Sequence, residues 1–150
     1  MALQDDPARL DIANYPMRYT SRVLFADMDG FRHLNNVAIA RFFEEGRAMC
    51  MIEAFGVDCM LNPRDGRIML FASAVIDYIA QAYYPGEVEV GTAILRVGNS
   101  SFQLGHAAFQ NGKCFALSNG ILVNSLHGKA EPLTGEERAV LARFAFGDGG

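Results

Sequence analysis

Hydrophobic and polar residues follow two different periods along the chain, and the period changes near residue 36. From Met17 to Ala26 they alternate loosely, in a stretch rich in aromatic and β-branched residues that predicts a strand. From Val37 to Phe55 apolar residues recur every three or four positions, which predicts a helix of about 20 residues and about 30 Å. Gly56 is placed to end this helix.

The pattern after this helix predicts further strands. Residues 57–67 contain a dense cluster of structure-breaking residues, which indicates a surface loop. Ile68 to Tyr84 is rich in β-branched and aromatic residues and ends at Pro85-Gly86, so we expect a strand, although its polar residues recur every four positions and also fit a helix. Val88 to Val97 alternates cleanly and follows as the next strand.

Two more strands and a short helix complete the prediction. Phe102 to Phe109 and Cys114 to Leu126 are joined through Asn111-Gly112, a dipeptide typical of tight β-hairpins. Residues 134–137 match a capping box, which predicts a short amphipathic helix. One strand, a long helix, four strands and a terminal helix indicate an α+β fold, in which an antiparallel sheet of about five strands curves around the long central helix.

Length and composition exclude several classes of protein. At 150 residues we expect a single domain, with residues 1–16 as an N-terminal arm and 146–150 as a loose tail. The net charge of −4, with no run among the 13 basic residues, argues against a nucleic-acid binder. The sequence lacks a signal peptide and an uninterrupted apolar span, so we expect a cytoplasmic protein with no membrane contact. Three widely spaced cysteines indicate reduced thiols and no metal site.

Polar residues concentrate where the predicted strand meets the predicted helix, in residues 27–36, which we name the joint. Asp27 and Asp29 are two positions apart, so they share one face if the strand persists through them. The first amides of the helix have no partner within the helix. A carboxylate beside such amides can act as base or nucleophile while the amides polarise a carbonyl, as acyl transfer requires. His33 is a further donor for the loop or the substrate.

The same residues have a simpler interpretation. Asp-x-Asp-Gly before a helix is more often a strand terminator with an Asx turn. A single histidine among polar loop residues is more often a structural donor than a catalyst. Taken alone, the joint leaves both interpretations open.

The wider pattern favours the chemical interpretation. The sequence of the joint, followed by Arg41 to Arg47, resembles the hotdog-fold acyl-CoA thioesterases of the 4-hydroxybenzoyl-CoA thioesterase type. Residues 76–78 together with 85–87, then 96–102, and finally 127–133 look like later segments of that family. The resemblance implies a long helix wrapped by an antiparallel sheet. It also implies homodimers or homotetramers whose active sites lie between subunits, and hydrolysis of an acyl-CoA thioester.

The resemblance also implies roles for particular residues. Asp29 would be the catalytic carboxylate, the amide near Asn36 would polarise the thioester carbonyl, and His33 would support them. We expect the substrate-binding residues to be Phe31, Arg32, Asn35, Phe42, Ser100 and Ser101. The family uses no metal and no redox cofactor, because the substrate brings coenzyme A with it.

Several choices stay open at the level of sequence. Many members of the family carry glycine immediately before the histidine, where this chain has Arg32. Asp29 can attack the thioester directly or activate water. A non-catalytic acyl-CoA or fatty-acyl binding module, and a hydratase or dehydratase on the same fold, are the alternative functions. The acyl group, its carrier (coenzyme A or acyl carrier protein) and the choice of dimer or tetramer are not determined.

Overall fold

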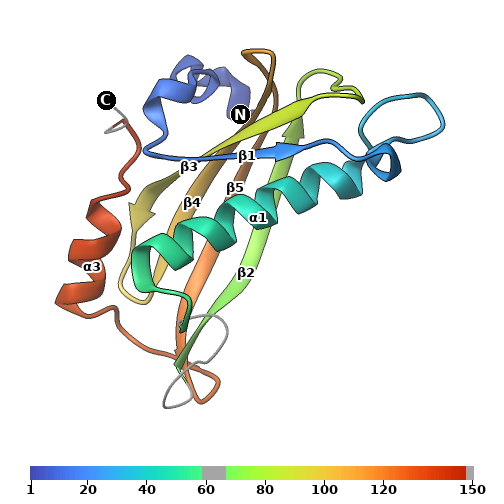
Figure 1. The fold of residues 1–150 in the computed structure, drawn as a ribbon. Coiled ribbons are helices and arrows are strands. Elements are labelled where there is room, and N and C mark those ends of the chain that lie inside the picture. Colours follow the sequence, from blue (N-terminus) through green and yellow to red (C-terminus); the bar gives the residue numbers. More distant parts are fainter. Residues whose placement is uncertain (59–66, 148–150) are drawn as a thin grey trace.

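The structure, a computed structural model, describes residues 1–58 and 67–147 and confirms the predicted α+β architecture (Figure 1). The strands are β1 (Met17–Arg22), β2 (Arg67–Tyr78), β3 (Glu87–Val97), β4 (Ser101–Gln110), β5 (Lys113–Leu126) and β6 (Lys129–Ala130). The α-helices are α1 (Asn36–Phe55) and α3 (Gly135–Ala142), and the 3-10 helices are η1 (Leu3–Asp5), η2 (Pro7–Leu10), η3 (Ile12–Asn14) and η4 (Phe25–Asp27). Most of the predicted surface loop at 57–67 lies outside the described residues.

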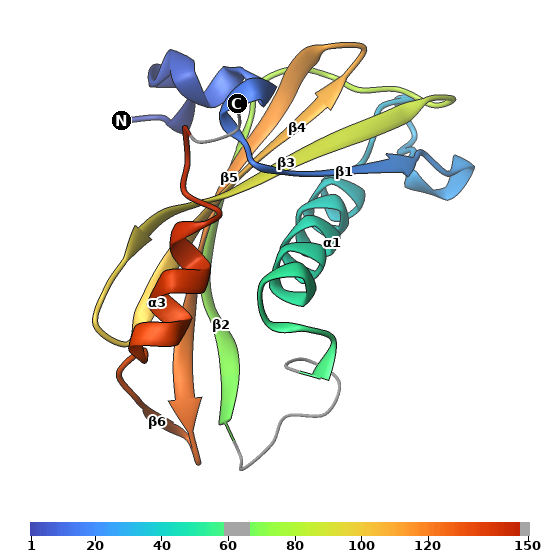
Figure 2. The same cartoon turned by 60° about the vertical axis from the view of Figure 1, so that its left-hand side comes forward.

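One antiparallel sheet carries the strands in the order β1-β3-β4-β5-β2, and β6 pairs with β5. The sheet is curved, and α1 lies on its concave side (Figures 1 and 2). α1 packs on β3, β4 and β1. Because β2 lies at the far end of the sheet from β1, α1 leaves much of this strand uncovered.

The predicted end of the second strand is wrong. β2 ends at Tyr78 and not at Tyr84. The amides of Ile79 and Ala80 both donate to the carbonyl oxygen of Phe115, at 2.9 and 3.1 Å, which ends the regular ladder with β5. The chain then leaves the sheet. The helical alternative for this segment is excluded, because residues 67–78 pair with β5.

α1 approaches the sheet closely at Gly46. Phe42 and Phe43 are buried on the same side of the helix. A Cβ atom on Gly46 would lie 2.8 Å from Val90 Cγ1 and 3.0 Å from Thr92 Oγ1. The absence of a side chain therefore lets α1 lie close to β3.

The N-terminal arm covers the outer face of the sheet, on the opposite side from α1 (Figure 2). Arg9 is 5% exposed and donates to Tyr15 Oη at 2.9 Å and to Asn119 Oδ1 at 2.8 Å. The ring of Phe146 packs edge-on against Tyr15, with centroids 5.2 Å apart, and the amide of Gly147 donates to the arm. The prediction of a loose tail is therefore wrong for residues 146 and 147, and residues 148–150 lie outside the described part.

A neutral histidine is buried between α1 and the sheet. His106 in β4 is 1% exposed, its Nδ1 lies 2.9 Å from Thr92 Oγ1, and its ring lies 5.8 Å from that of Phe43. Burial, followed by the positive charges of Arg47 and Arg9, lowers the pKa of His106 to about 3. Its Nε2 has no hydrogen-bond partner among the described residues.

We predict that His106 makes the fold less stable in mild acid. Its pKa is about 3 in the folded protein and 6.5 for a histidine in an unfolded chain, so between these values the unfolded chain binds a proton that the folded chain does not. The free energy of unfolding should therefore fall by about 2 kcal/mol from about pH 7.5 to about pH 5. Urea denaturation across this range measures the effect. His106→Asn should lose this component, and an equal pH dependence in the two proteins would contradict the prediction.

Candidate functional site

The joint folds into a tight loop between η4 and α1. Met28 and Leu34 form an isolated antiparallel bridge, and inside it the amide of Asp29 donates to the carbonyl oxygen of His33 at 2.8 Å. Arg32 has a φ of 64°, in the left-handed region that favours glycine. This conformation gives a physical reason for the glycine that many thioesterases of the resembled type carry before the histidine.

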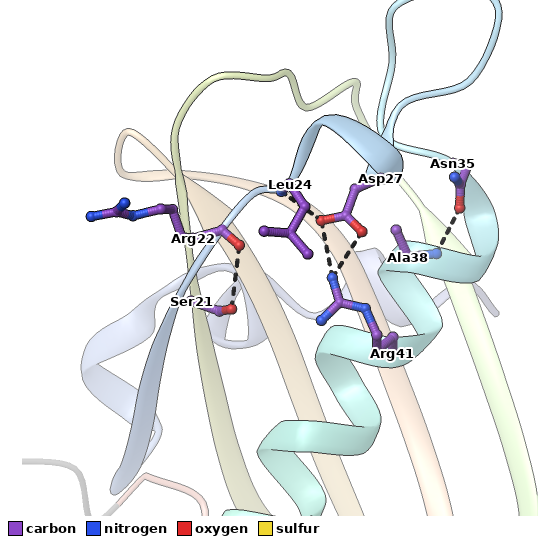
Figure 3. Close-up of polar contacts among 7 residues, drawn as sticks. All are labelled: Ser21, Arg22, Leu24, Asp27, Asn35, Ala38 and Arg41. Carbon is purple, nitrogen blue, oxygen red and sulfur yellow. Dashed lines mark hydrogen bonds and ion pairs between the residues drawn. The ribbon is translucent and has the colours of Figure 1, made fainter.

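Asp27 is a structural carboxylate. β1 ends at Arg22, earlier than predicted, and Asp27 lies in η4, so the strand does not persist through Asp27 and Asp29 as a shared face would require. Its buried side chain accepts hydrogen bonds from Arg41 Nη2 at 2.9 and 3.0 Å and from the amide of Leu24 at 2.8 Å (Figure 3). This ion pair joins η4 to α1 and fixes the two ends of the joint to each other.

Asp29 is exposed, and the loop holds only one of its two carboxylate oxygens. Oδ1 accepts from the amides of Phe31 at 2.8 Å and His33 at 3.2 Å, which is an Asx-turn geometry. Within the described residues, Oδ2 has no hydrogen bond. The turn therefore orients the carboxylate and leaves one oxygen available. The same geometry therefore allows Asp29 to stabilise the loop through Oδ1 and to take part in chemistry through Oδ2.

The start of α1 supplies free backbone donors next to this loop. Asn35 is the N-cap, and its Oδ1 accepts from the amide of Ala38 at 2.7 Å (Figure 3). The amide of Asn35 itself donates to the carbonyl oxygen of Asp27 at 2.8 Å. The amides of Asn36 and Val37 have no hydrogen-bond acceptor in the part of the chain that is described. Both residues are exposed, so these two amides can bind an oxyanion at the positive end of the helix dipole.

His33 is held by a neighbouring segment that the sequence did not point to. Its ring packs edge-on against Tyr83, with centroids 5.7 Å apart. Tyr83 is in turn fixed by Gln110, which accepts from its amide and donates to its carbonyl oxygen, both at 2.8 Å. The signal in the sequence was the aromatic pair Tyr83-Tyr84 beside Pro85. This pair indicates a turn, but it does not show which other segment the turn contacts.

The predicted substrate-binding residues near the joint differ in how accessible their side chains are to a ligand. Phe31 is 81% exposed and Arg32 is also exposed, so both can contact a ligand. The side-chain oxygen of Asn35 is used for the helix cap. The prediction for Phe42 is wrong for this chain, because its ring is fully buried in the core and Arg41 covers it at 4.7 Å. Helical spacing placed Phe42 on the face that packs on the sheet.

Ser100 and Ser101 do not lie at the joint of the same chain. Ser100 lies in the turn between β3 and β4, and Ser101 begins β4, where it pairs with Val123 near the end of β5. This turn and the joint lie at opposite ends of the sheet (Figure 1). A single chain therefore does not bring the two serines together with Asp29.

The arrangement at the joint has the parts for acyl transfer. It combines an exposed carboxylate oxygen with two free amide donors at a helix start, which can polarise a carbonyl and stabilise the oxyanion that develops from it. Within residues 1–58 and 67–147, no group of three or more His, Cys, Asp or Glu side chains is placed to hold a metal ion. None of the helices in these ranges is long and apolar enough to cross a membrane.

Comparison with known proteins gives matches both of sequence and of fold. The sequence model of the Thioesterase-like superfamily matches residues 23–138. The PA5185 protein of Pseudomonas aeruginosa is 27% identical, with a TM-score of 0.77 over 89% of this chain and 94% of that one. A predicted thioesterase of Bacillus stearothermophilus is 28% identical, with a TM-score of 0.75 over 86% and 97%. Among curated proteins, no match was found.

A third structure shows the same fold at lower identity. It is a thioesterase of Thermus thermophilus complexed with coenzyme A and zinc, 24% identical, with a TM-score of 0.74 over 87% of this chain and 95% of that one. The curved sheet around one long helix is the hotdog fold that the resemblance implied. Because the superfamily match spans most of the chain, this protein belongs to the thioesterase-like superfamily.

Proposed function

We propose that the protein hydrolyses an acyl-CoA thioester, with Asp29 as the reacting carboxylate. The observation that carries this proposal is that, among the described residues, Asp29 Oδ2 and the amides of Asn36 and Val37 have no hydrogen-bond partner, and that all three belong to the joint and the helix start that follows it. Membership of the superfamily supports a thioester hydrolase in general. The Thermus neighbour, with coenzyme A bound, supports coenzyme A as the carrier.

In the proposed reaction the thioester carbonyl oxygen accepts hydrogen bonds from the helix-start amides. Asp29 then either removes a proton from water that attacks the carbonyl carbon, or attacks that carbon itself and forms an anhydride that water hydrolyses. Both routes break the carbon–sulfur bond and release the free acid and coenzyme A. His33, held by Tyr83, lies in the same loop and supports its conformation.

We further propose a homodimer that pairs the free edges of two β2 strands. β2 has 12 residues and is the last strand of the sheet. Its exposed large hydrophobic residues lie on both faces of the strand: Leu70 45%, Phe71 43%, Val75 53% and Tyr78 48%. An uncovered strand edge flanked by such side chains is a natural surface for pairing with a second copy.

Antiparallel pairing of these edges would complete the site. The end of β2 leads toward the joint, where the amide of Leu34 donates to the carbonyl oxygen of Ala82. The start of β2 lies near the β3–β4 turn, through β5. A two-fold axis across β2 therefore sets the joint of one subunit beside the turn of the other. This arrangement would bring Ser100 and Ser101 to a substrate bound at the partner's joint.

We predict that Asp29→Asn lowers kcat for acyl-CoA hydrolysis by roughly 10²-fold or more, because both routes need the carboxylate. Release of free coenzyme A thiol from a panel of acyl-CoA substrates measures the rate, after the protein's own cysteines are blocked. Glu136→Gln, the same change at an exposed position in α3, is the control and should keep full activity.

Three results would contradict the proposal. Equal rates in the wild type and Asp29→Asn would remove the role of Asp29. Tight acyl-CoA binding without turnover at any chain length would instead select a non-catalytic binding module, and a change in enoyl absorbance without thiol release would select a hydratase.

We predict that the double variant Leu70→Glu with Val75→Glu is monomeric at micromolar concentration and loses most of its thioesterase activity. The new carboxylates would be desolvated at the paired edge, where the proposed dimer buries them. Sedimentation equilibrium measures the mass. Leu10→Glu, at an exposed hydrophobic position in the arm, is the control and should remain dimeric. A wild-type monomer with full activity would exclude both the dimer and an active site shared between subunits.

A further inference from the structure

A second concave site lies between the C-terminal half of α1 and the start of β2. We name it the α1–β2 pocket; its volume is about 250 Å³. Its walls are almost entirely apolar, with Met51 and Phe55 from α1 and Ile68 and Met69 from β2. Phe71 and Leu122 also line it, and among the described lining residues the guanidinium of Arg47 is the one charged group.

Arg47 is a half-buried cation that forms no ion pair within residues 1–58 and 67–147. Its guanidinium lies 3.7 Å from the centroid of the Phe71 ring. Burial lowers the pKa of Arg47, and the charge of Glu44, one turn earlier, opposes this shift. No carboxylate among the described residues forms an ion pair with Arg47, and none of its N–H groups has a hydrogen-bond acceptor there. A cation in these surroundings favours an incoming anion.

The contact between Arg47 and the Phe71 ring depends on Gly120 in β5, which has no side chain. A Cβ atom on Gly120 would lie 2.7 Å from Phe71 Cε2, so the Phe71 ring occupies space that only glycine leaves free. A guanidinium stacked on a ring keeps its N–H donors in its own plane, where they can bind a carboxylate through two parallel hydrogen bonds. Gly120 and Phe71 therefore hold Arg47 in a conformation suited to binding a carboxylate.

The position of the pocket connects it to the joint. The pocket lies at the start of β2, whereas the joint lies beyond its end. In the proposed dimer the two β2 edges run antiparallel, so the pocket of one subunit would face the joint of its partner. The acyl group of a thioester bound at one joint would then extend into the apolar pocket of the other subunit, toward Arg47.

We propose that the α1–β2 pocket receives the acyl group and that Arg47 binds a carboxylate at its far end. The favoured substrates are then CoA thioesters of dicarboxylic acids, with one carboxyl group in the thioester and the other on Arg47. This inference rests on the proposed function. A single guanidinium among apolar walls matches one carboxylate, whereas a phosphate group carries more charge and needs further cations.

The test compares two acyl groups of equal carbon number. The wild type should hydrolyse adipyl-CoA with at least about tenfold higher kcat/KM than hexanoyl-CoA, because only adipyl-CoA pairs with the buried cation. Arg47→Met should lower kcat/KM for adipyl-CoA by roughly 10- to 100-fold, mainly through KM, and leave hexanoyl-CoA unchanged or faster. Arg47→Lys keeps the charge and should retain part of the preference. Arg96→Met, at an exposed arginine on β3, is the matched control.

A binding measurement separates this inference from the proposed hydrolysis. Calorimetric titration of Asp29→Asn with adipyl-CoA and hexanoyl-CoA should show tighter binding of adipyl-CoA, and the double variant Asp29→Asn with Arg47→Met should lose the difference. If the wild type shows no turnover but this Arg47-dependent preference is present, the pocket assignment stands and the hydrolytic function fails. Equal loss for both substrates in Arg47→Met, or no preference in the wild type, would overturn the assignment.

Discussion

The buried carboxylate of Asp27 is the contact on which the geometry of the joint depends. Its side chain holds Arg41 of α1 at 2.9 Å, and its carbonyl oxygen accepts the amide of Asn35, so one residue fixes both η4 and the helix start. Asn35 then caps α1 and leaves the amides of Asn36 and Val37 free. Without the ion pair, a buried carboxylate would lose its charged partner, and the loop that carries Asp29 would lose its anchor.

The depth of α1 in the curved sheet has consequences far from the joint. Gly46 lets the helix settle onto β3, and α1 then covers β1, β3 and β4 more than the far edge. β2 is left with exposed hydrophobic residues, and a pocket remains between it and the end of α1. The proposed dimer edge and the proposed acyl pocket therefore have one common cause. The side chain of Arg47 lies over the Phe71 ring, and that ring occupies the space that Gly120 leaves because it has no side chain.

Elements governed by local chemistry were predictable, and contacts between distant segments were not. The bounds of α1 and the Asn111-Gly112 hairpin follow from apolar periodicity and turn residues, and the structure confirms both. The predicted end of β2 at Tyr84 failed because β-branched and aromatic residues continue past the point where β5 stops pairing with it. The assignment of Phe42 as a ligand contact failed because its helical spacing places it on the face of α1 that packs on the sheet, where its ring is buried.

The class of fold followed from the sequence alone, through the periodicity of its apolar residues, and residue type and a local motif made the joint and Asp29 the candidates for chemistry. Only the tertiary structure decided that Asp27 is structural, because its partner Arg41 lies on a different element. The structure also shows that Ser100 and Ser101 lie away from the joint of the same chain. It shows, in addition, that the guanidinium of Arg47 on α1 lies over the ring of Phe71 on β2. These relations are set by how the sheet curves around α1, and no short stretch of sequence encodes that curvature.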